Sequence, residues 1–462
     1  MNKKPRPYQR DALRWVLAYA VDHPTGRLIL VIPPRGGKTL VGALVVLHLA
    51  VRHGLRALWL VHREELLDEA IEHLVDVGIH RASIGVIKAG RSSDPDARIQ
   101  VASEQTLDRR GKLPVAHLVV TDECHLDTAP RRRRLRRAYP KAFLLGLTAT
   151  PKPPPQRDLG EDYDAMMVVV QPSELIHDGF LAVPTVYAPD RSAIPDLRGL
   201  RRVGGDYRPD DLEPLLMRRG LLDEQVSEWA RLSEGRISLA YPVTIAHSKA
   251  LVARFQAHGI NAKHLDGETP AEGENGRRAI LKGLNEGTLP IGCSVGVVSV
   301  GTNLPRVKCI LGVRPTFSLV LYTQQGMRCA TPFEGIRPRI LDVVGNCYVH
   351  GYPFEDRRWS LKNAESGIPI REGAHHLKRC PSCGAMMHPA TLVCTACAAA
   401  FPVPPPVVPD VPLTLHEVTP AQSKLREEQS RLLLFARDRG FSDPDEWVAR
   451  VMERKHGAEA RP

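Results

Sequence analysis

The chain lacks the long apolar run that a membrane-spanning helix requires. Its longest apolar stretch, Leu40–Val51, falls short of the roughly 20 residues needed to cross a bilayer. The first residues, MNKKPRPYQR, lead into a mixed polar and apolar helix and show no apolar core of a secretory signal. We therefore expect a cytoplasmic protein with no membrane partner.

The chain also has few aromatic residues, and its cysteines do not form the pattern of a disulfide-bonded protein. Phe, Trp and Tyr together make up 5% of the chain, so base stacking is not expected to dominate any recognition of nucleic acid. Five cysteines are scattered singly, which favours reduced core thiols and excludes a disulfide framework. The chain shows neither an internal repeat of about 20 to 50 residues nor a nuclease motif.

Basic residues are in clear excess. Lys and Arg number 63 against 52 Asp and Glu, which leaves a net charge of +11. A phosphate polymer is a natural partner for this excess, although a basic surface that is merely solvated fits the same numbers. The densest run, RRRRLRR at Arg131–Arg137, predicts either a solvated helix face or a phosphate-binding ridge.

A phosphate-binding loop is predicted between an apolar strand and an apolar helix. The sequence PPRGGKT follows the run Leu28–Ile32 and precedes Leu40–Val51. In such a loop, backbone N–H groups and the helix N-terminus hold phosphate oxygens, the lysine reaches the β- and γ-phosphates, and the hydroxyl ligates Mg²⁺. The candidate nucleotide-binding residues are Pro34, Arg35, Gly36, Gly37, Lys38 and Thr39. Ile32 stands where the full pattern has its first glycine.

A second motif, DECH, ends the apolar strand Leu118–Val120. There Asp122 is placed to hold the metal and Glu123 to orient an attacking water. Strand-end carboxylates alone are a weak sign, but the order and strand context of the two motifs together predict nucleotide hydrolysis with Lys38, Asp122 and Glu123 in catalytic roles.

Two alternations of apolar strands and helical periods indicate two α/β halves, each with a parallel sheet. Strands are expected at 28–32, 57–61, 99–102, 118–121 and 143–147, and then at 242–246, 262–265, 291–298, 309–312 and 340–344. The predicted order is a first sheet domain (1–188), a linker or insertion (189–236), a second sheet domain (237–365), a cysteine module (376–401), a Pro-rich linker (402–415) and a helical tail (416–462), with helices at 421–437 and 444–456.

The cysteine module has the spacing of a structural zinc site. Cys380 and Cys383 form one C-x-x-C turn, and Cys394 and Cys397 form a second after ten residues. Zn²⁺ prefers four tetrahedral ligands, and each turn presents two thiolates to one point. The sequence therefore predicts one bound Zn²⁺.

Further segments stand in order along both halves: RPYQ (Arg6–Gln9), VHREELL (Val61–Leu67), VASEQTL (Val101–Leu107), GLTATP (Gly146–Pro151), LDGETP (Leu265–Pro270), SVGTNLP (Ser299–Pro305), RPTFSLVLYTQQGMR (Arg314–Arg328) and HGYPFEDRRWSL (His350–Leu361). This series resembles the superfamily 2 DEAD/DEAH-box helicases, and among them the RadD-like branch, over about residues 5–400. The resemblance implies two RecA-like parallel-sheet domains followed by a zinc ribbon and a helical tail.

The resemblance also implies a role for individual residues. ATP and Mg²⁺ would be handled by Arg6, Gln9, Lys38, Thr39, Asp122 and Glu123, with Thr39 and Asp122 on the metal and Arg328 reaching the nucleotide from the second domain. Hydrolysis would be coupled to domain movement by His125, Thr148, Thr150 and Gln324. The nucleic-acid backbone would lie along His62, Arg63, Gln105 and Thr106.

The implied function is an ATP-dependent DNA helicase or translocase in repair, recombination or replication, with single-strand-binding or recombination proteins as possible partners. Two departures from the family pattern bear on this prediction. Asn303 stands where an aspartate is usual, and Met327 and Thr331 replace a glycine and the second arginine of Q-x-x-G-R-x-x-R. An ATP-gated clamp or adaptor with weak turnover, and the motor subunit of a restriction system, therefore stay open, as does DNA against RNA.

Overall fold

The computed structural model describes residues 4–62, 65–92, 94–110, 113–126, 130–155, 157–189, 194, 197, 200–296, 304–370, 378–387, 393–400, 432 and 444–456. The chain divides into two compact units, Met1–Pro402 and Val403–Pro462, and each is described by itself. The predicted sites Arg63 and Asn303, and the helix expected at 421–437 apart from Leu432, lie outside the described residues.

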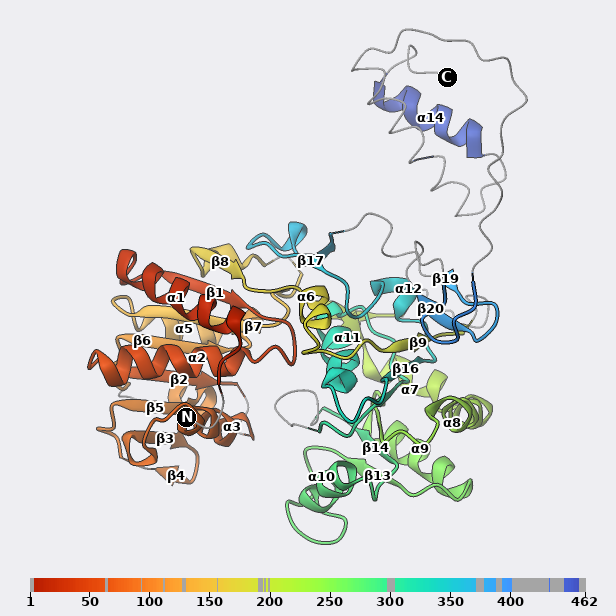
Figure 1. Ribbon diagram of the computed structural model, residues 1–462, viewed down its shortest axis with the longest axis horizontal. Coiled ribbons are helices and arrows are strands. Elements are labelled where there is room, and N and C mark those ends of the chain that lie inside the picture. The colour runs from red at the N-terminus through yellow and green to blue at the C-terminus, as the bar shows by residue number, and fades with distance from the viewer. Residues whose placement is uncertain are drawn as a thin grey trace. The chain divides into compact units, whose positions relative to one another are not determined.

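The first half of the first unit is built on an eight-stranded sheet (Figure 1). In spatial order its strands are β4 (Arg91–Ser92), β3 (Ile84–Lys88), β5 (Ile99–Ser103), β2 (Ala57–Val61), β6 (Leu118–Asp122), β7 (Phe143–Thr148), β1 (Arg27–Val31) and β8 (Ala165–Val168). All neighbours are parallel except the edge pair β3–β4. The carboxyl ends of the parallel strands therefore share one edge, where sheets of this kind bind ligands.

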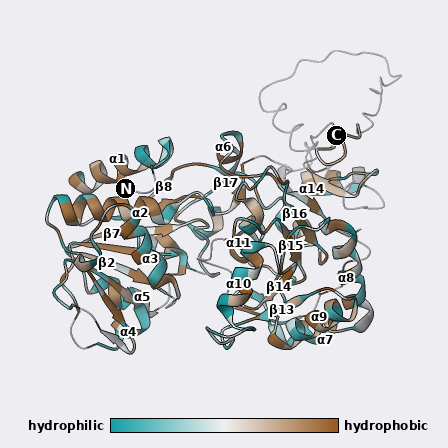
Figure 2. Ribbon diagram, turned by 60° about the horizontal axis from the view of Figure 1, so that its bottom comes forward, coloured by the Kyte–Doolittle hydropathy of each residue, from teal (hydrophilic) through white to brown (hydrophobic). Residues whose placement is uncertain are grey.

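Helices cover both faces of this sheet. They are α1 (Pro7–Asp22), α2 (Lys38–Val46), α3 (Glu65–Asp76), α4 (Glu104–Asp108), α5 (Pro130–Arg137) and α6 (Pro172–His177). Because side chains alternate along a strand, Trp59 packs with the cluster that includes α2 and α3, whereas its neighbours Leu58 and Leu60 pack with the cluster that includes α4 and α5. The apolar colouring of the strands in Figure 2 reflects this burial on both faces.

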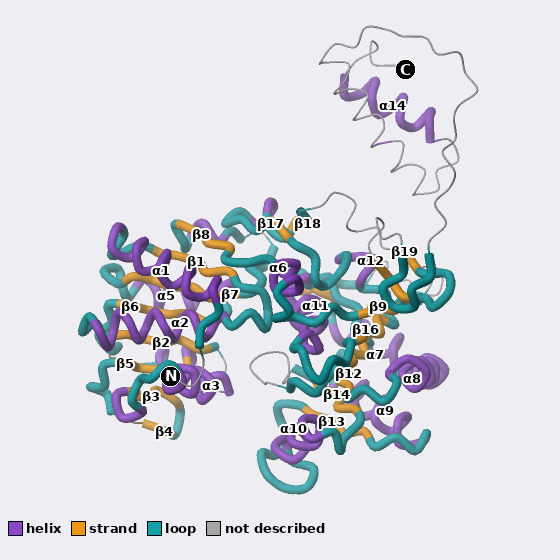
Figure 3. Tube along the Cα trace, viewed as in Figure 1, coloured by secondary structure: helices purple, strands orange, loops and turns teal. Residues whose placement is uncertain are grey.

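A second eight-stranded sheet follows (Figure 3). Its strands in spatial order are β13 (Ala262–Leu265), β14 (Ile291–Ser294), β12 (Ser238–Ala240), β15 (Cys309–Gly312), β16 (Arg339–Asp342), β9 (Thr185–Tyr187), β20 (Ala385–Met387) and β19 (Lys378–Arg379). Pairing is parallel from β13 to β9 and antiparallel from β9 to β19. The prediction of two parallel-sheet α/β domains is confirmed.

The described residues of the second half also form two small hairpins and several helices. The hairpins are β10–β11 (Arg202–Val203 with Asp206–Tyr207) and β17–β18 (Arg357–Arg358 with Ile368–Pro369). The helices are α7 (Pro209–Leu216), α8 (Arg219–Ser233), α9 (Ile245–Ala257), α10 (Arg277–Glu286), α11 (Leu319–Gly326) and α12 (Cys347–His350).

The prediction of a strand at 242–246 is wrong. The strand in this region is β12, which ends at Ala240, and α9 begins at Ile245. Pro242 has no N–H to give to a strand ladder, and the Thr244 hydroxyl accepts from the His247 N–H, as a helix N-cap does. The local pattern was apolar enough for a strand, but it contains the start signals of a helix.

Two segments join a different half from the one that the sequence order suggested. Strand β9, placed with the first domain in the sequence analysis, pairs with β16 of the second sheet. Conversely, residues 352–370, which we call the return segment, bond back to the chain that leaves β7. The Lys152 ammonium donates to the carbonyls of Asn363 (2.6 Å) and Ser366 (2.7 Å), and the Ser366 hydroxyl donates to the Pro151 carbonyl (2.8 Å).

The second unit contains helix α14 (Pro444–His456), with the bounds expected from the sequence. Its Val448 and Met452, one turn apart, are buried. In neither unit do the described residues include a helix long and apolar enough to cross a membrane.

Candidate nucleotide-binding and catalytic site

The loop between β1 and α2 turns sharply, and its conformation needs the two glycines. A Cβ on Gly36 would lie 2.5 Å from the Ile32 side chain, and Gly37 has a left-handed backbone with φ of 81°. Arg35 also has a positive φ, 67°. The turn ends at the first residue of α2, Lys38, so the unpaired N–H groups of the helix start face the loop.

The start of α1 holds this loop from the side. The Tyr8 hydroxyl and the Gln9 amide nitrogen both donate to the Gly36 carbonyl, at 2.6 and 2.9 Å. The Gln9 amide oxygen accepts from the Arg6 N–H at 2.9 Å. The Gln9 amide nitrogen thus holds the loop and its oxygen caps the start of α1, and the role of Gln9 in reading adenine stays a prediction.

Lys38 lies between the two carboxylates of the DECH motif. Its Nζ is 2.9 Å from Asp122 Oδ1 and 2.9 Å from Glu123 Oε1. Burial opposes the charge of Lys38, but the two carboxylates outweigh it and raise the lysine pKa above its usual value. Burial likewise opposes the charge of Glu123, yet Lys38 and His125 lower the pKa of this carboxyl, so it is ionised at neutral pH.

The predicted coupling residues of the first half form one buried chain of contacts. His125 Nδ1 lies 3.3 Å from Glu123 Oε2 and 3.0 Å from the Thr148 hydroxyl, which in turn accepts from the Thr150 N–H at 3.1 Å. The chain links the carboxylate beside Lys38 to the end of β7. Pro151, the next residue, accepts from the return segment, so the same path continues to Ser366.

A pocket of about 610 Å³ lies over this loop. From the first half it is lined by Lys4, Arg6, Gln9, Pro33, Pro34, Arg35, Gly37, Lys38, Thr39, Leu40, Glu69, Glu72, His73, Asp76, Glu123, Ala149 and Phe180. From the second half it is lined by Gln324, Met327, Arg328, Thr331 and Pro332. The structure therefore brings the two halves of the predicted site together, and both Arg328 and Thr331 line the pocket.

Three guanidinium groups line this pocket, and two of them, those of Arg35 and Arg328, repel each other. Burial, and then the nearby Arg328, lower the pKa of Arg35 to about 10, and burial also lowers the pKa of Arg328. Like charges that face one space destabilise each other, and an anion between them would relieve the repulsion. Together with Lys38, they make the pocket suited to a polyphosphate.

Among the pocket residues that sequence reasoning missed, Phe180 and Glu69 bear most directly on a nucleotide. Phe180 lies under the Arg6 guanidinium, 4.1 Å from its ring centroid, and offers an aromatic surface to a nucleobase. Glu69, on α3, has its pKa raised to about 7 by burial, which reduces its repulsion of phosphates near neutral pH. No local pattern marks either residue, because each reaches the loop only through the tertiary fold.

Comparisons with known proteins agree with this geometry. Residues 2–153 match the family model "Type III restriction enzyme, res subunit". A "51.5 kDa protein" of Lactococcus phage (isolate 7-9) is 28% identical over 376 residues, which is 80% of this chain and 77% of the relative. The "Putative ATP-dependent helicase IRC3" of Saccharomyces cerevisiae is 24% identical over 343 residues, which is 69% of this chain and 48% of the relative.

Among solved structures, a fragment described as "a putative HsdR subunit of a type I restriction enzyme from Vibrio vulnificus YJ016" matches with a TM-score of 0.54 at 19% identity. The match covers 74% of this chain and 64% of that fragment, and it supports the fold alone. The chain is thus similar to ATP-dependent helicases and to restriction-enzyme subunits, with the family match confined to residues 2–153. The chain spans about half the length of its yeast relative, with 48% covered.

Of the predicted nucleic-acid contacts, the three that the structure describes, His62, Gln105 and Thr106, are not among the lining residues of the nucleotide pocket. His62 follows β2, and Gln105 and Thr106 lie on α4 directly after β5. Strands β2 and β5 are parallel neighbours, so all three residues lie at the same sheet edge as the phosphate loop. Their contact with a nucleic-acid backbone stays a prediction.

Three of the six arginines in the arginine run form ion pairs with carboxylates. On α5, Arg133 pairs with Glu161 at 2.7 Å and Asp162 at 3.0 Å, Arg134 pairs with Asp108 at 2.8 Å, and Arg136 pairs with Asp162 at 3.1 Å. A phosphate-binding ridge would need these charges to be available. The pairing favours a structural helix face that fastens α5 to its neighbours.

The four predicted zinc ligands converge. Their sulfur atoms all lie within 4.8 Å of one another, with Cys380 and Cys397 at 3.8 Å and Cys383 and Cys394 at 3.6 Å. A tetrahedron with Zn–S bonds of about 2.3 Å places its sulfurs about 3.8 Å apart, so the residues fit the ion. The ribbon is not separate from the second half, because β20 extends that sheet through β9.

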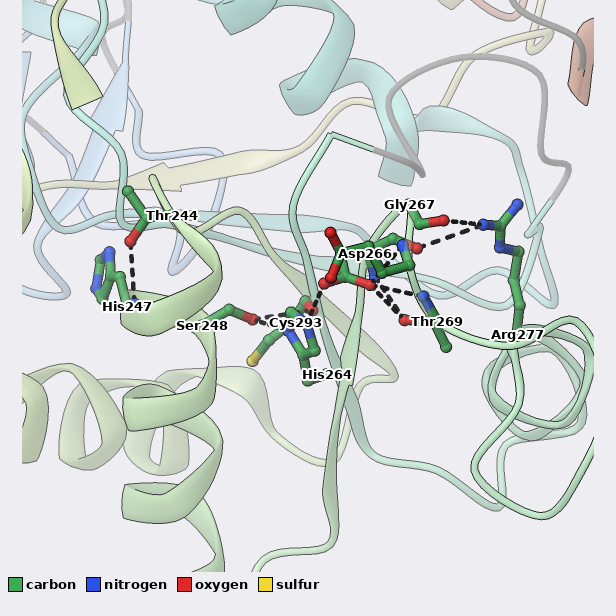
Figure 4. A network of polar contacts seen from close by, with 10 residues as sticks. Thr244, His247, Ser248, His264, Asp266, Gly267, Thr269, Arg277 and Cys293 are labelled. Carbon is green, nitrogen blue, oxygen red and sulfur yellow. Dashed lines mark hydrogen bonds and ion pairs between the residues drawn. The ribbon is translucent and has the colours of Figure 1, made fainter. Parts of the chain in front are cut away.

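A serine–histidine–aspartate chain lies in the second half (Figure 4). Ser248 Oγ is 2.7 Å from His264 Nδ1, and His264 Nε2 is 2.9 Å from Asp266 Oδ2. Ser248 is completely buried and also donates to the Cys293 carbonyl, so a substrate has no path to this hydroxyl. Asp266 accepts from the Thr269 N–H at 2.7 Å, so the chain serves to fix the LDGETP loop.

Proposed function

We propose that this protein is an ATP-dependent motor on nucleic acid, a DNA helicase or translocase. The observation that carries the proposal is the convergence of Lys38, Glu123 and Arg328 on one pocket, the first two from the first half and the last from the second. A site built from both halves can couple the state of a bound nucleotide to the relation between them.

The residues of the site would have separate roles in hydrolysis. Lys38 would exchange its two carboxylate partners for the β- and γ-phosphates, which frees Glu123 to orient the attacking water. Asp122 and the Thr39 hydroxyl would hold Mg²⁺, which neutralises charge on the phosphates when bound. Arg328, buried at the edge of the pocket, would stabilise the charge that develops on the γ-phosphate.

Movement would follow from this arrangement. The path from Glu123 through His125 and Thr148 reaches Pro151 and the return segment, which gives hydrolysis a physical connection beyond the pocket. Contacts to the nucleic-acid backbone, with His62, Gln105 and Thr106 as candidates, would be independent of sequence and sensitive to salt.

Membership of the RadD-like branch is also part of the proposal. The HGYPFEDRRWSL segment, which led to that resemblance, is bonded to the start of α6, where the Gln171 amide nitrogen donates to the Arg357 carbonyl at 3.1 Å and the Ser173 N–H donates to Asp356 at 2.9 Å. A role in DNA repair, recombination or replication, a cytoplasmic location, and single-strand-binding or recombination proteins as partners belong to the same proposal.

Two alternative functions each have an observation in their favour. Thr331 lies in the pocket where the family pattern has a second arginine, which favours an ATP-gated clamp or adaptor with weak turnover. The match of residues 2–153 to a restriction-enzyme subunit favours a motor that works with a separate nuclease.

One experiment separates a nucleic-acid motor from an ATP-gated clamp. Phosphate release from ATP is measured with no nucleic acid, single-stranded DNA, duplex DNA and RNA, for the wild type, Lys38→Ala and the control Lys282→Ala, whose side chain is 72% exposed. The proposal expects stimulation by DNA, loss in Lys38→Ala and no change in the control. DNA binding that depends on ATP without turnover would support the clamp, and stimulation by RNA alone would refute a DNA motor.

A further inference from the structure

Arg328 is carried by a short 3₁₀ helix, Met327–Ala330, which we call the arginine turn. A helix end leaves carbonyl groups without partners, and buried carbonyls need them. Here three successive carbonyls, those of Cys329, Ala330 and Thr331, follow the arginine at the wall of the pocket. The partners of these carbonyls hold the backbone that carries Arg328.

Lys308 bonds two of these three carbonyls. Its ammonium group donates to the Cys329 carbonyl at 3.2 Å and to the Thr331 carbonyl, and the Ala330 carbonyl accepts from the Ala182 N–H at 2.8 Å. Lys308 is 1% exposed and directly precedes β15 in the second sheet. A rigid strand thus holds the turn through one side chain.

The surroundings of Lys308 differ from those of an ordinary buried lysine. Among the ion pairs of the described residues, none involves Lys308. Its other neighbours are the Phe333 ring, with Nζ 6.0 Å from the centroid, and the titratable groups of Cys329 and Arg35. Burial lowers the pKa of Lys308 to about 8, whereas burial raises the pKa of the Cys329 thiol to about 12.

We propose that Lys308 is a positioning residue for ATP hydrolysis, whose ammonium group caps the arginine turn and fixes Arg328 at the pocket. The inference rests on the proposed function, since it assigns a residue to that same reaction. Lys308 does not line the pocket, so its effect on the nucleotide passes through the backbone of the turn. A cation at the carboxyl end of a helix is also favoured by the helix dipole.

The cap depends on charge, which gives it a pH dependence with a definite sign. Below pH 8 the ammonium form is present and the cap is intact. As pH rises through about 8, the group becomes a neutral amine, whose hydrogen bonds to carbonyls are weaker. The rate of hydrolysis should then fall, well before Arg35, with its pKa lowered to about 10, loses charge.

The test compares Lys308→Met, which keeps the bulk and removes the donors, with Lys308→Arg, which keeps the charge, and with the exposed control Lys282→Met. For each, kcat, KM and the binding of a fluorescent ATP analogue are measured with saturating DNA, and kcat is measured from pH 6.5 to about 9.5, a window chosen around the lysine pKa. Lys308→Met should lose on the order of ten- to a hundredfold in kcat, with analogue binding nearly unchanged. Lys308→Arg should keep more activity and lose the fall in kcat near pH 8.

The outcomes are distinct. An unchanged kcat in Lys308→Met, or equal loss of kcat and of analogue binding, would overturn the positioning role and leave the proposed function intact. If neither variant folds, the wild-type profile decides: a kcat that stays level from pH 7 to about 9 overturns the inference. Absence of hydrolysis in the wild type would overturn the proposed function and this inference together.

Discussion

Two buried lysines, one in each half of the molecule, have opposite electrostatics. Lys38 lies 2.9 Å from each of two carboxylates, which raise its pKa although burial works against the charge. Lys308 is bonded to two neutral carbonyls, and burial lowers its pKa to about 8. Burial acts in the same direction on both residues, so the partner decides whether the charge is stabilised.

The same contrast extends to what the two halves contribute to the pocket. The first half brings a lysine and two carboxylates that can change partners when phosphates bind. The second half brings Arg328, which is fixed by its backbone, and Lys308 helps to hold that backbone. The first half therefore supplies charged groups that exchange partners when a nucleotide binds. The second half supplies one guanidinium group whose position must be held.

The largest expected effect comes from the lysine that has carboxylate partners. Lys38→Ala and Glu123→Gln should each reduce ATP hydrolysis to the level of a blank without protein, because one removes the charge on the phosphates and the other the group that orients water. Steady-state phosphate release at saturating DNA measures this, with Lys282→Ala as control. Turnover like that of the wild type in both variants would refute the catalytic role of Lys38 and Glu123, and with it the motor hypothesis.

Arg328→Ala tests the contribution of the second half. Loss of an arginine that stabilises the transferring phosphoryl group costs about 10³–10⁵ in rate in related reactions, so kcat should fall by at least about 10³-fold. Binding of the ATP analogue should fall much less, because Lys38 and the phosphate loop remain. Equal losses of binding and kcat would show that Arg328 holds the ground-state nucleotide and does not act selectively in the transition state.

Zinc tests whether the two halves are stabilised separately. Elemental analysis should find one Zn²⁺ per chain, and Cys383→Ser should lose it. Because β20 of the ribbon extends the second sheet and Cys380 and Cys394 lie in that half's core cluster, hydrogen exchange should rise in β9 and β16 and stay unchanged in β1 and β6. Uniform destabilisation of both sheets, or no zinc in fresh reduced protein, would contradict this prediction.

The sequence located the nucleotide site well because its residues sit in local patterns. Lys38, Asp122 and Glu123 each follow an apolar strand within a short motif, and parallel strands bring such ends to one edge. The same logic could not find Phe180, Glu69 or Lys308. Each of these acts through a tertiary contact with a segment far away in the chain, and nothing in its immediate neighbours marks it.

The errors in the predicted fold have a similar origin. Strand β9 is short and apolar like the strands of both sheets, so its sequence does not reveal which sheet it joins. The strand expected at 242–246 failed because apolar residues were given more weight than Pro242 and the capping Thr244. Within each half, the period of the apolar residues and the helix- or strand-breaking residues predict most helices and strands. Which of the two sheets a strand joins depends on tertiary contacts that no local pattern encodes.

The smallest expected effect is that of Thr331→Arg. Thr331 lines the same pocket as Arg328, so an arginine there would add a cation near the γ-phosphate and should raise kcat. The gain should be modest, about tenfold or less, because Arg6, Arg35 and Arg328 already line this space and a further guanidinium adds repulsion before ATP binds. Since the Thr331 carbonyl bonds to Lys308, the substitution keeps the backbone position, and only the side chain changes.

Thr331→Val is the matched control, because it keeps the shape of the threonine side chain without adding a charge. Steady-state ATPase of the three proteins at saturating DNA measures the effect. A fall in kcat with arginine and not with valine would show that the charge of this pocket is already complete.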